Sequence, residues 1–194
     1  NKKVVVPGKT LQEISKILPG SAEEFVDIFL TDNHILFEFE NTTVVSRLID
    51  GEYLNYNRIL PDNYERIAFI NAAELIRAVE RASIVTEDKL GGSNSKTYIK
   101  LEFEEGMLKI SSSSAGGSIY EEMPIHFTGE TLVIAFNCRY LLDALKAAGE
   151  TEIVCLRMNG PLMGMCIEPG EGETEERLPV KYTLFIMPLR MNGK

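Results

Sequence analysis

The residue types that most often catalyse reactions or bind metals are few in this 194-residue chain. The three cysteines, Cys138, Cys155 and Cys166, form no CxxC pair, and His34 and His126 lie far apart in the sequence. A structural zinc site needs about four such ligands in paired spacing. We therefore predict no metal site and no cofactor, and we expect reduced, mostly buried cysteines.

A run of serine and glycine is the nearest feature to the phosphate-binding loop of an enzyme. Residues 111–114 are all serine and Gly116 and Gly117 follow, but the run lacks the lysine and the helix start of a P-loop. The sequence identifies no third residue that would complete a catalytic triad with His126 and Cys138. We interpret the run as a hairpin loop and predict a non-catalytic protein, with an enzyme as the rival class that an activity assay would detect.

The overall composition is typical of a globular protein, with 44% hydrophobic and 25% charged residues. No apolar run approaches the ~20 residues that cross a bilayer, so we expect no membrane association. The formal net charge is −9. Taken alone, this charge argues against a protein that holds nucleic acid by bulk electrostatic attraction.

The elements that would position a site follow a repeated order of one strand, one helix and three strands. In the first copy, residues 3–6 read as a strand and residues 9–18 as an amphipathic helix. Short, β-rich runs at residues 25–30, 35–40 and 43–48 complete the copy, with turn residues between them.

Two further copies of this order follow along the chain. The second has a strand at 66–70, a helix from the cap Asn71 to about Ser83, and strands near 97–104, 107–112 and 118–125, with a hairpin turn at Glu105-Gly106. The third has a strand at 132–136, the cap Asn137, a helix at 139–148 ended by Gly149, and strands at 152–158, 162–167 and 180–188.

One such unit has too little core to stand alone, because a single amphipathic helix would cover one face of a small antiparallel sheet. Two units would pair to make a domain. We therefore predict one unpaired unit at residues 1–60 and one complete domain at residues 61–194, joined by a linker at about 50–63. We also expect the partner of the first unit to lie upstream of Asn1.

The three predicted helices carry cations at helical spacing, while the acidic residues concentrate elsewhere. Glu13, Glu74, Glu80 and Asp143 also lie on these helices, so ordinary solvated faces are one interpretation. A modest basic lining that slides along DNA with little affinity is the other. The cations are Lys9, Lys16, Arg77, Arg81, Arg139 and Lys146.

Five stretches, in this order along the chain, carry a family resemblance. They are VVVPGKTLQEISKIL at the start, SRLIDGEYLNYNRILP at 46–61, AVERASIVTEDKLGG at 78–92, FNCRYLLDALKA at 136–147 and FIMPLR at 185–190. Together they resemble the bacterial DNA sliding clamp, the beta subunit of DNA polymerase III. The similar part is the second half of the family's middle domain, at 1–60, and its whole C-terminal domain, at 61–194.

The resemblance implies an α+β fold, the DNA clamp fold, in which the repeated units pair two per domain. It implies a cytoplasmic, nucleoid-associated processivity factor: a homodimeric ring that encircles duplex DNA, with the helix cations facing the DNA. The implied partners are the clamp loader, the catalytic subunit of the replicative polymerase and other proteins with a clamp-binding motif. The alternative is a scaffold protein of the same fold that never meets DNA.

The resemblance also implies a hydrophobic groove that binds partner peptides beside the C-terminus. The other interpretation is that Met163, Met165 and Met187 with their apolar neighbours are simply core. The residues that match the family's groove are Leu54, Arg58, Ile59, Leu90, Asn137, Tyr140, Leu162, Gly164, Phe185, Ile186, Met187, Pro188, Leu189 and Arg190.

The subunit interface of the family would fall on Ile84 and Val85, which follow the second predicted helix. Two apolar residues after a helix fit buried core equally well, so both interpretations stay open.

Overall fold

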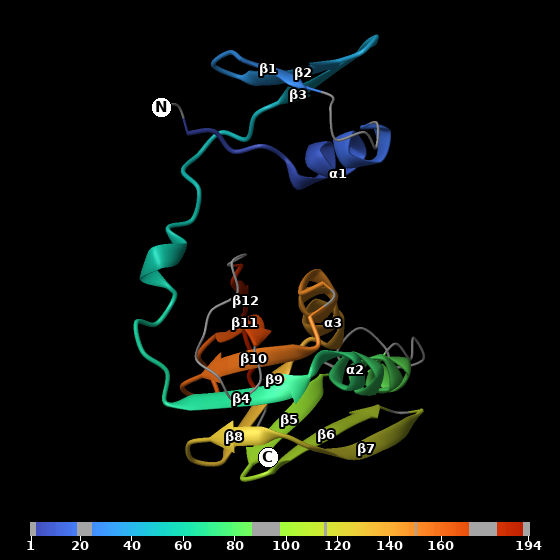
Figure 1. The fold of residues 1–194 in the computed structure, drawn as a ribbon, viewed down its shortest axis with the longest axis vertical. Helices are drawn as coiled ribbons and strands as arrows, with labels where there is room; N and C mark the ends of the chain where they lie inside the picture. Colours follow the sequence, from blue (N-terminus) through green and yellow to red (C-terminus); the bar gives the residue numbers. More distant parts are fainter. Residues whose placement is uncertain are drawn as a thin grey trace. The chain divides into compact units, whose positions relative to one another are not determined.

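The computed structural model describes residues 3–18, 25–86, 98–114, 116–149, 151–170 and 182–191. The chain divides into two compact units, Asn1–Ile59 and Leu60–Lys194 (Figure 1). Each unit has its own hydrophobic core. The two are therefore described separately.

The described part of the first unit forms one α-helix and one antiparallel sheet. Helix α1 (Gly8–Ile17) is followed by β1 (Asp27–Leu30), β2 (His34–Phe39) and β3 (Thr42–Arg47), which pair in that order. A short 3-10 turn, η1 (Tyr56–Arg58), comes later in the chain. The core packs Ile14 of the helix against alternate residues of β2 and against Leu48, which follows β3. The residues from β2 are Ile35, Phe37 and Phe39.

The predicted strand at residues 3–6 is wrong, because this segment joins no sheet ladder in the described part of the chain. One backbone bond holds it, from the Ile49 amide to the Val5 carbonyl at 2.9 Å. Val4 and Val6 still pack against the core of the unit. The repeated strand-helix-three-strand order therefore lacks its first strand in this copy.

In the second unit, the described residues form two helices and two antiparallel sheets (Figure 1). One sheet has the order β12-β11-β10-β4-β8 and the other β7-β6-β5-β9. The elements in chain order are β4 (Arg66–Asn71), α2 (Ala72–Thr86), β5 (Ile99–Glu104), β6 (Met107–Ser114), β7 (Gly117–Pro124), β8 (His126–Thr128), β9 (Leu132–Phe136), α3 (Cys138–Ala147), β10 (Ile153–Met158), β11 (Met165–Gly170) and β12 (Leu184–Ile186).

The first strand of each repeat pairs with the sheet of the other repeat. Strand β4 opens the second repeat but pairs with β10 of the third, from Asn71 against Ile153 to Arg66 against Met158. Strand β9 opens the third repeat but pairs with β5 of the second. The two repeats are therefore joined by continuous ladders, and neither completes a sheet of its own.

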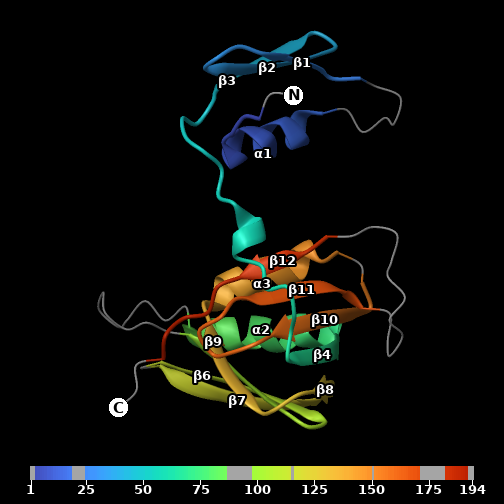
Figure 2. The ribbon, with the colours of Figure 1, turned by 90° about the vertical axis from the view of Figure 1, so that its left-hand side faces the viewer.

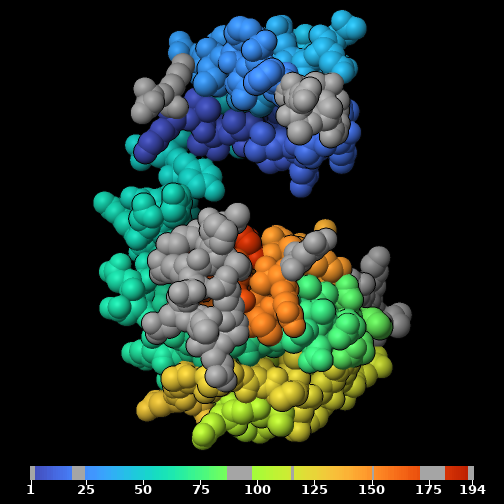
Figure 3. Space-filling model, viewed as in Figure 1, coloured from blue at the N-terminus to red at the C-terminus, as the bar shows by residue number. Residues whose placement is uncertain are grey.

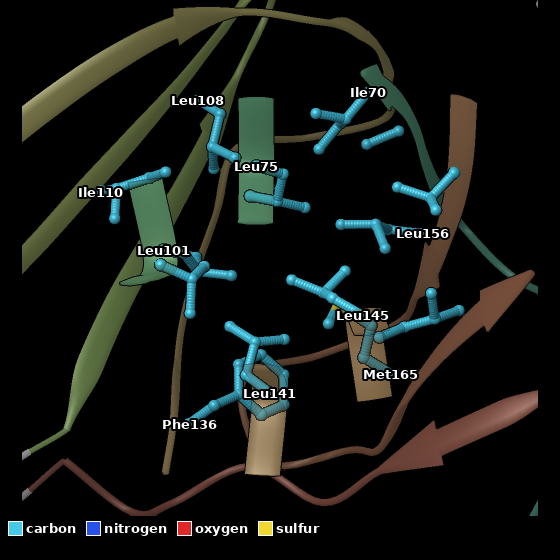
Figure 4. Close-up of a cluster of buried hydrophobic side chains, with 14 of the residues drawn as sticks. Ile70, Leu75, Leu101, Leu108, Ile110, Phe136, Leu141, Leu145, Leu156 and Met165 are labelled. Atoms are coloured by element: carbon cyan, nitrogen blue, oxygen red, sulfur yellow. The ribbon is translucent and has the colours of Figure 1, made fainter. Parts of the chain in front are cut away.

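The core lies between the two sheets and the two helices. Figure 4 shows Leu75 of α2 with Leu141 and Leu145 of α3 pointing toward side chains from both sheets, and these three leucines are almost fully buried. Truncation of such a buried leucine to alanine typically costs about 2–5 kcal/mol. The sheet residues around them are Ile70, Leu101, Leu108, Ile110, Phe136, Leu156 and Met165.

The predicted helix starts and turns are confirmed by side-chain and backbone geometry. The Asn71 Oδ1 accepts the Glu74 amide at 3.0 Å, and the Asn137 Oδ1 accepts the Arg139 and Tyr140 amides at 3.0 and 3.2 Å. Gly106, at φ 73°, supplies the positive φ that the turn between β5 and β6 requires. No helix in the described ranges combines the length and the apolar character of a membrane span.

Several predicted strands differ at their ends from those observed. The run 118–125 corresponds to β7, which ends at Pro124, and the sequence analysis missed the separate strand β8 that follows and joins the other sheet. The run 162–167 begins pairing only at Met165. In the run 180–188, pairing is described for Leu184–Ile186, and residues 180 and 181 lie outside the described residues, as does residue 97.

The chain after β12 joins the two sheets at their edges. Strand β12 lies at one edge of its sheet, and β9 lies at one edge of the other sheet. From β12 the chain runs toward the sheet that contains β9 (Figure 2), and the Leu189 amide donates to the Ala135 carbonyl at 2.7 Å. The C-terminal segment, residues 187–191, is thereby held against both sheets.

Replacing Asn137 with alanine should lower the free energy of unfolding by about 1 kcal/mol, because two amides of the first turn of α3 lose their acceptor. Asn137→Ser keeps a capping oxygen and should stay close to the parent. Urea denaturation followed by circular dichroism measures both variants. Equal stability of the alanine and serine variants would show that the cap contributes nothing.

Candidate functional site

Four large apolar side chains are exposed where β11, β12 and α3 meet the C-terminal segment. The exposed fractions are 66% for Tyr140, 54% for Leu162, 47% for Met163 and 59% for Met187. We name these four residues, with the half-buried Phe185, the C-terminal patch. Clustered exposed apolar side chains of this kind are typical of surfaces that bind another molecule.

Leu162 and Met163 are both exposed because they lie in a turn that precedes β11. Strand alternation would have buried one of them. Instead, the Met163 amide donates to the Gly160 carbonyl at 3.1 Å, and pairing starts at Met165. Met163 is thus a candidate binding residue that the sequence analysis did not select. The Asn159-Gly160-Pro161 sequence is the signal that could have extended the turn this far.

Alternation along β12 divides its residues between the core and the surface. Ile186 is only 6% exposed, pairs with Met165 and belongs to the core. Met187 is exposed, and Phe185 is half-buried above the buried Gly164. Met165 is therefore core, as one interpretation expected, whereas Met163 and Met187 are surface.

The remaining predicted groove residues of the second unit lie on either side of this patch. Asn137 uses its side-chain oxygen to cap α3, which fixes the start of the helix that carries Tyr140. Pro188 and Leu189 are half-buried, and Arg190 is exposed at the end of the segment. Leu54, Arg58 and Ile59 belong to the first unit, so their place beside the patch stays a prediction.

Leu54 lines an open cavity of about 950 Å³ within the first unit. Residues 3–5 and 51–57 form its walls. Ile59 is 37% exposed and follows the turn that contains Arg58. Leu90 lies outside the described residues.

Three of the six predicted DNA-facing cations are paired with carboxylates of the same chain. Lys16 contacts Glu13 at 2.9 Å, and Lys146 of α3 contacts Glu80 of α2 at 2.8 Å. Arg81 of α2 donates twice to Glu121 of β7, at 2.6 and 2.5 Å, and this ion pair lowers the pKa of Glu121. These pairs reduce the positive field that the helices present.

The other three cations, Lys9, Arg77 and Arg139, are exposed and have no ion-pair partner within the described ranges. Arg77 lies on α2 and Arg139 on α3. The two helices pack against each other, and Figure 3 shows their surfaces side by side on one face of the second unit. Because no carboxylate of the described residues neutralises these two guanidinium groups, they can contact an anionic partner.

The end of α2 places Ile84 on the surface, where it is 75% exposed, while Val85 is half-buried. Ile84 is therefore not core. The nearby Arg81–Glu121 ion pair ties this end of the helix to β7, which is an edge strand of its sheet. An exposed apolar residue beside an unpaired strand edge is a suitable surface for association.

Family models match nearly the whole chain in the order of its two units. The central domain of the DNA polymerase III beta subunit matches residues 1–55, and the C-terminal domain of the same subunit matches residues 57–183. The chain belongs to the DNA polymerase III beta subunit family. The predicted α+β clamp fold is thereby confirmed.

The sequences of individual members of the beta subunit family align with almost the whole chain. The chain is 38% identical over 192 residues to the beta sliding clamp of Staphylococcus aureus and 34% identical over 192 residues to that of Staphylococcus epidermidis. These matches cover 98% of this chain and 47% of the relatives. The chain thus spans about half the length of the curated relatives it matches.

Solved structures of sliding clamps share the fold of this chain. The clamp of Bacillus subtilis is 31% identical, with a TM-score of 0.80, over 97% of this chain and 47% of the other. The clamp of Pseudomonas aeruginosa bound to griselimycin is 27% identical, with a TM-score of 0.78, over 97% of this chain and 47% of the other.

The titratable groups of this beta-subunit chain indicate structural rather than reactive cysteines. All three cysteines are buried, and no group of three His, Cys, Asp or Glu side chains in the described ranges is placed to hold a metal. Burial raises the pKa of the Cys155 thiol to about 11 and also raises the pKa of Cys166. Tyr64, whose hydroxyl lies 2.8 Å from the Cys166 Sγ, has a pKa raised by burial and by this contact.

Alkaline pH should destabilise the second unit through Cys155. Burial raises the pKa of its thiol from 9.0 to about 11 on folding, so the folded state favours the protonated thiol. The stability that this preference contributes is complete below about pH 9 and is lost as the pH rises to about 11. The loss should be roughly 2–3 kcal/mol. Urea denaturation between pH 8 and 11 measures this slope, which should be shallower in Cys155→Ala. Identical slopes in the parent and this variant would contradict the assignment.

Proposed function

We propose that this chain provides the C-terminal domain and part of the central domain of a sliding clamp, the non-catalytic processivity factor of a DNA polymerase. The observation that carries the proposal is the ordered match of both domain models over residues 1–55 and 57–183. Relatives that bear the name beta sliding clamp cover 98% of the chain. On this proposal the protein works in the cytoplasm, on the DNA of the nucleoid.

Duplex DNA is the proposed partner of the helix faces. Arg77 and Arg139 are exposed on two adjacent helices, and the described residues offer them no carboxylate. Lys9 gives α1 a similar cation, while Lys16, Arg81 and Lys146 carry partly neutralised charges. A ring retains DNA by topology, so a few screened cations suffice, and stronger contacts would slow sliding.

Short peptide segments of polymerases and other clamp-binding proteins are the proposed partners of the C-terminal patch. Exposed methionine, leucine and tyrosine side chains make an adaptable apolar surface for such peptides. Arg190 lies at the end of this surface and supplies a hydrogen-bond donor. Clamps from Pseudomonas aeruginosa and Bartonella birtlesii have been solved bound to griselimycin, which supports a ligand site in this family.

Leu54, Arg58, Ile59 and Leu90 would complete this groove in the whole protein. The exposed Ile84, with Val85, would contribute to a homodimer interface that closes the ring. A clamp loader would open and close that ring around DNA.

A scaffold of the same fold that never meets DNA is the second candidate function. The observation in its favour is the pairing of Lys16, Arg81 and Lys146 with carboxylates of their own chain. A clamp-loading assay with the full-length protein on circular DNA separates the two candidates, because only a sliding clamp is retained on the circle.

Shortening single side chains of the C-terminal patch should weaken peptide binding. Met187→Ala and Tyr140→Ala in the full-length protein should each reduce affinity for a polymerase-tail peptide by roughly 5–150-fold, the range of about 1–3 kcal/mol for an anchor contact. Tyr120→Ala is the matched control, because Tyr120 is 60% exposed on β7 and should not contact the peptide. Calorimetric titration measures all three variants. Parent-like binding by Met187→Ala and Tyr140→Ala would place the groove elsewhere.

Two double variants that each remove two positive charges test the DNA-facing helices. Arg77→Gln with Arg139→Gln removes two cations that have no carboxylate partner among the described residues. Arg81→Gln with Lys146→Gln removes two cations that already have carboxylate partners. Log affinity falls as log salt rises, and roughly one counterion is released per contacted phosphate. The first variant should therefore reduce the steepness of this slope by about 2, and the second variant should reduce it by less.

Fluorescence anisotropy with duplex DNA across a salt series, in the full-length protein, measures these slopes. An equal reduction in both variants would indicate a bulk charge effect. Unchanged slopes in both would show that these helices do not face DNA.

A further inference from the structure

Four consecutive residues at the start of the second unit are each held by groups that are distant in the sequence. We name these residues, 63–66, the entry segment. The side chain of Asn159, in the turn after β10, bonds to it twice: the Asn159 Oδ1 accepts the Glu65 amide at 2.8 Å, and the Nδ2 donates to the Asn63 carbonyl at 2.9 Å. One side chain thus fixes two backbone groups of the segment.

Arg66 holds the other end of the entry segment. Its side chain is only 12% exposed, and its guanidinium group donates to the Glu130 carbonyl at 2.9 Å and to the Asn159 carbonyl. Gly129 packs directly against this backbone, since a Cβ at Gly129 would lie 2.6 Å from the Glu65 carbonyl oxygen. The turn before β9 and the turn after β10 therefore both hold the segment.

Tyr64 attaches the entry segment to a third place in the second unit. Its hydroxyl lies 2.8 Å from the Sγ of Cys166, which is fully buried in β11. The Tyr64 side chain is half-buried, whereas its neighbours Asn63 and Glu65 are exposed. The contact with Cys166 fixes the segment to the sheet through a group that does not move with the turns.

These contacts extend beyond what the sheet requires. Strand β4 begins at Arg66, so Asn63, Tyr64 and Glu65 belong to no helix or strand. Asn63 and Glu65 add no apolar side chain to the core. Ordering such residues costs conformational entropy without burying apolar surface. What the contacts do fix is the direction in which the chain enters the second unit.

We propose that Asn159 and Tyr64 are positioning residues that fix how the central and C-terminal domains of the whole clamp are joined, and that they thereby keep the ring closed. The inference rests on the proposed homodimeric ring. Such a ring closes only when both of its interfaces meet at once, so each protomer must hold its curvature. A rigid joint supplies that curvature in advance, whereas a loose joint has to be ordered at each closure, which weakens the ring.

Exchange of protomers between full-length rings tests this joint. Rings labelled with a donor fluorophore are mixed with rings labelled with an acceptor, and energy transfer rises as rings open and exchange protomers. Asn159→Ala removes both bonds to the entry segment and should speed exchange roughly 5–30-fold, the factor for one residue that is no longer ordered. Tyr64→Phe removes only the hydroxyl contact and should give a smaller acceleration.

Asn71→Ala is the matched control for a loss of stability alone. The Asn71 side chain also accepts a backbone amide in the second unit, but that amide belongs to Glu74 in the first turn of α2. This variant should lower the midpoint of urea denaturation and leave the exchange rate at the parent value. A merely structural role for Asn159 would likewise lower the midpoint without changing the exchange rate.

The outcomes separate the positioning role from the function on which it rests. Parent-like exchange in both Asn159→Ala and Tyr64→Phe, or equal acceleration in Asn71→Ala, overturns the positioning role and leaves the ring in place. A full-length parent that forms no ring overturns the proposed homodimer, and the joint with it. If Asn159→Ala does not fold, Tyr64→Phe decides the question, because it keeps the aromatic ring and its packing.

Discussion

Backbone hydrogen bonding between the two repeats of the second unit is the constraint on which the rest of its structure depends. Strand β4 starts one repeat and pairs with β10 of the other, and β9 does the reverse with β5. A strand needs a neighbour for its amides and carbonyls, so each repeat completes the sheet of the other. This exchange closes a common core and sets α2 beside α3, which places Arg77 and Arg139 on adjacent helices.

The same exchange determines where the C-terminal patch lies. Because β9 and β12 are the last strands of the two sheets, the segment after β12 can bond to β9 through Leu189. Met187 is then carried on backbone that is anchored on both sides, with Phe185 held against Gly164. Apolar side chains stay exposed on a rigid support, and a rigid support reduces the ordering cost of binding a flexible peptide.

Several cations on the helices of this chain are offset by carboxylates of the same chain. The net charge is −9, and Lys146 and Arg81 are held by Glu80 and Glu121. Such exposed pairs add little to stability, but they reduce the field at the helix surface. Salt screens what remains over a Debye length of about 8 Å at physiological ionic strength. A weak, short-range attraction of this kind would suit the sliding along DNA that we propose for the whole protein.

The sequence by itself determined the features that depend on neighbouring residues. The caps Asn71 and Asn137 and the turn at Gly106 were predictable because their hydrogen bonds and dihedral angles involve residues a few positions apart. Only the tertiary structure decided the exchange of β4 and β9 and the position of the Phe185 ring against Gly164. Each of these depends on groups that are distant in sequence, and a local pattern carries no information about which strand supplies the missing partner. For the same reason residues 3–6 have the pattern of a strand but join no sheet ladder in the described part of the chain.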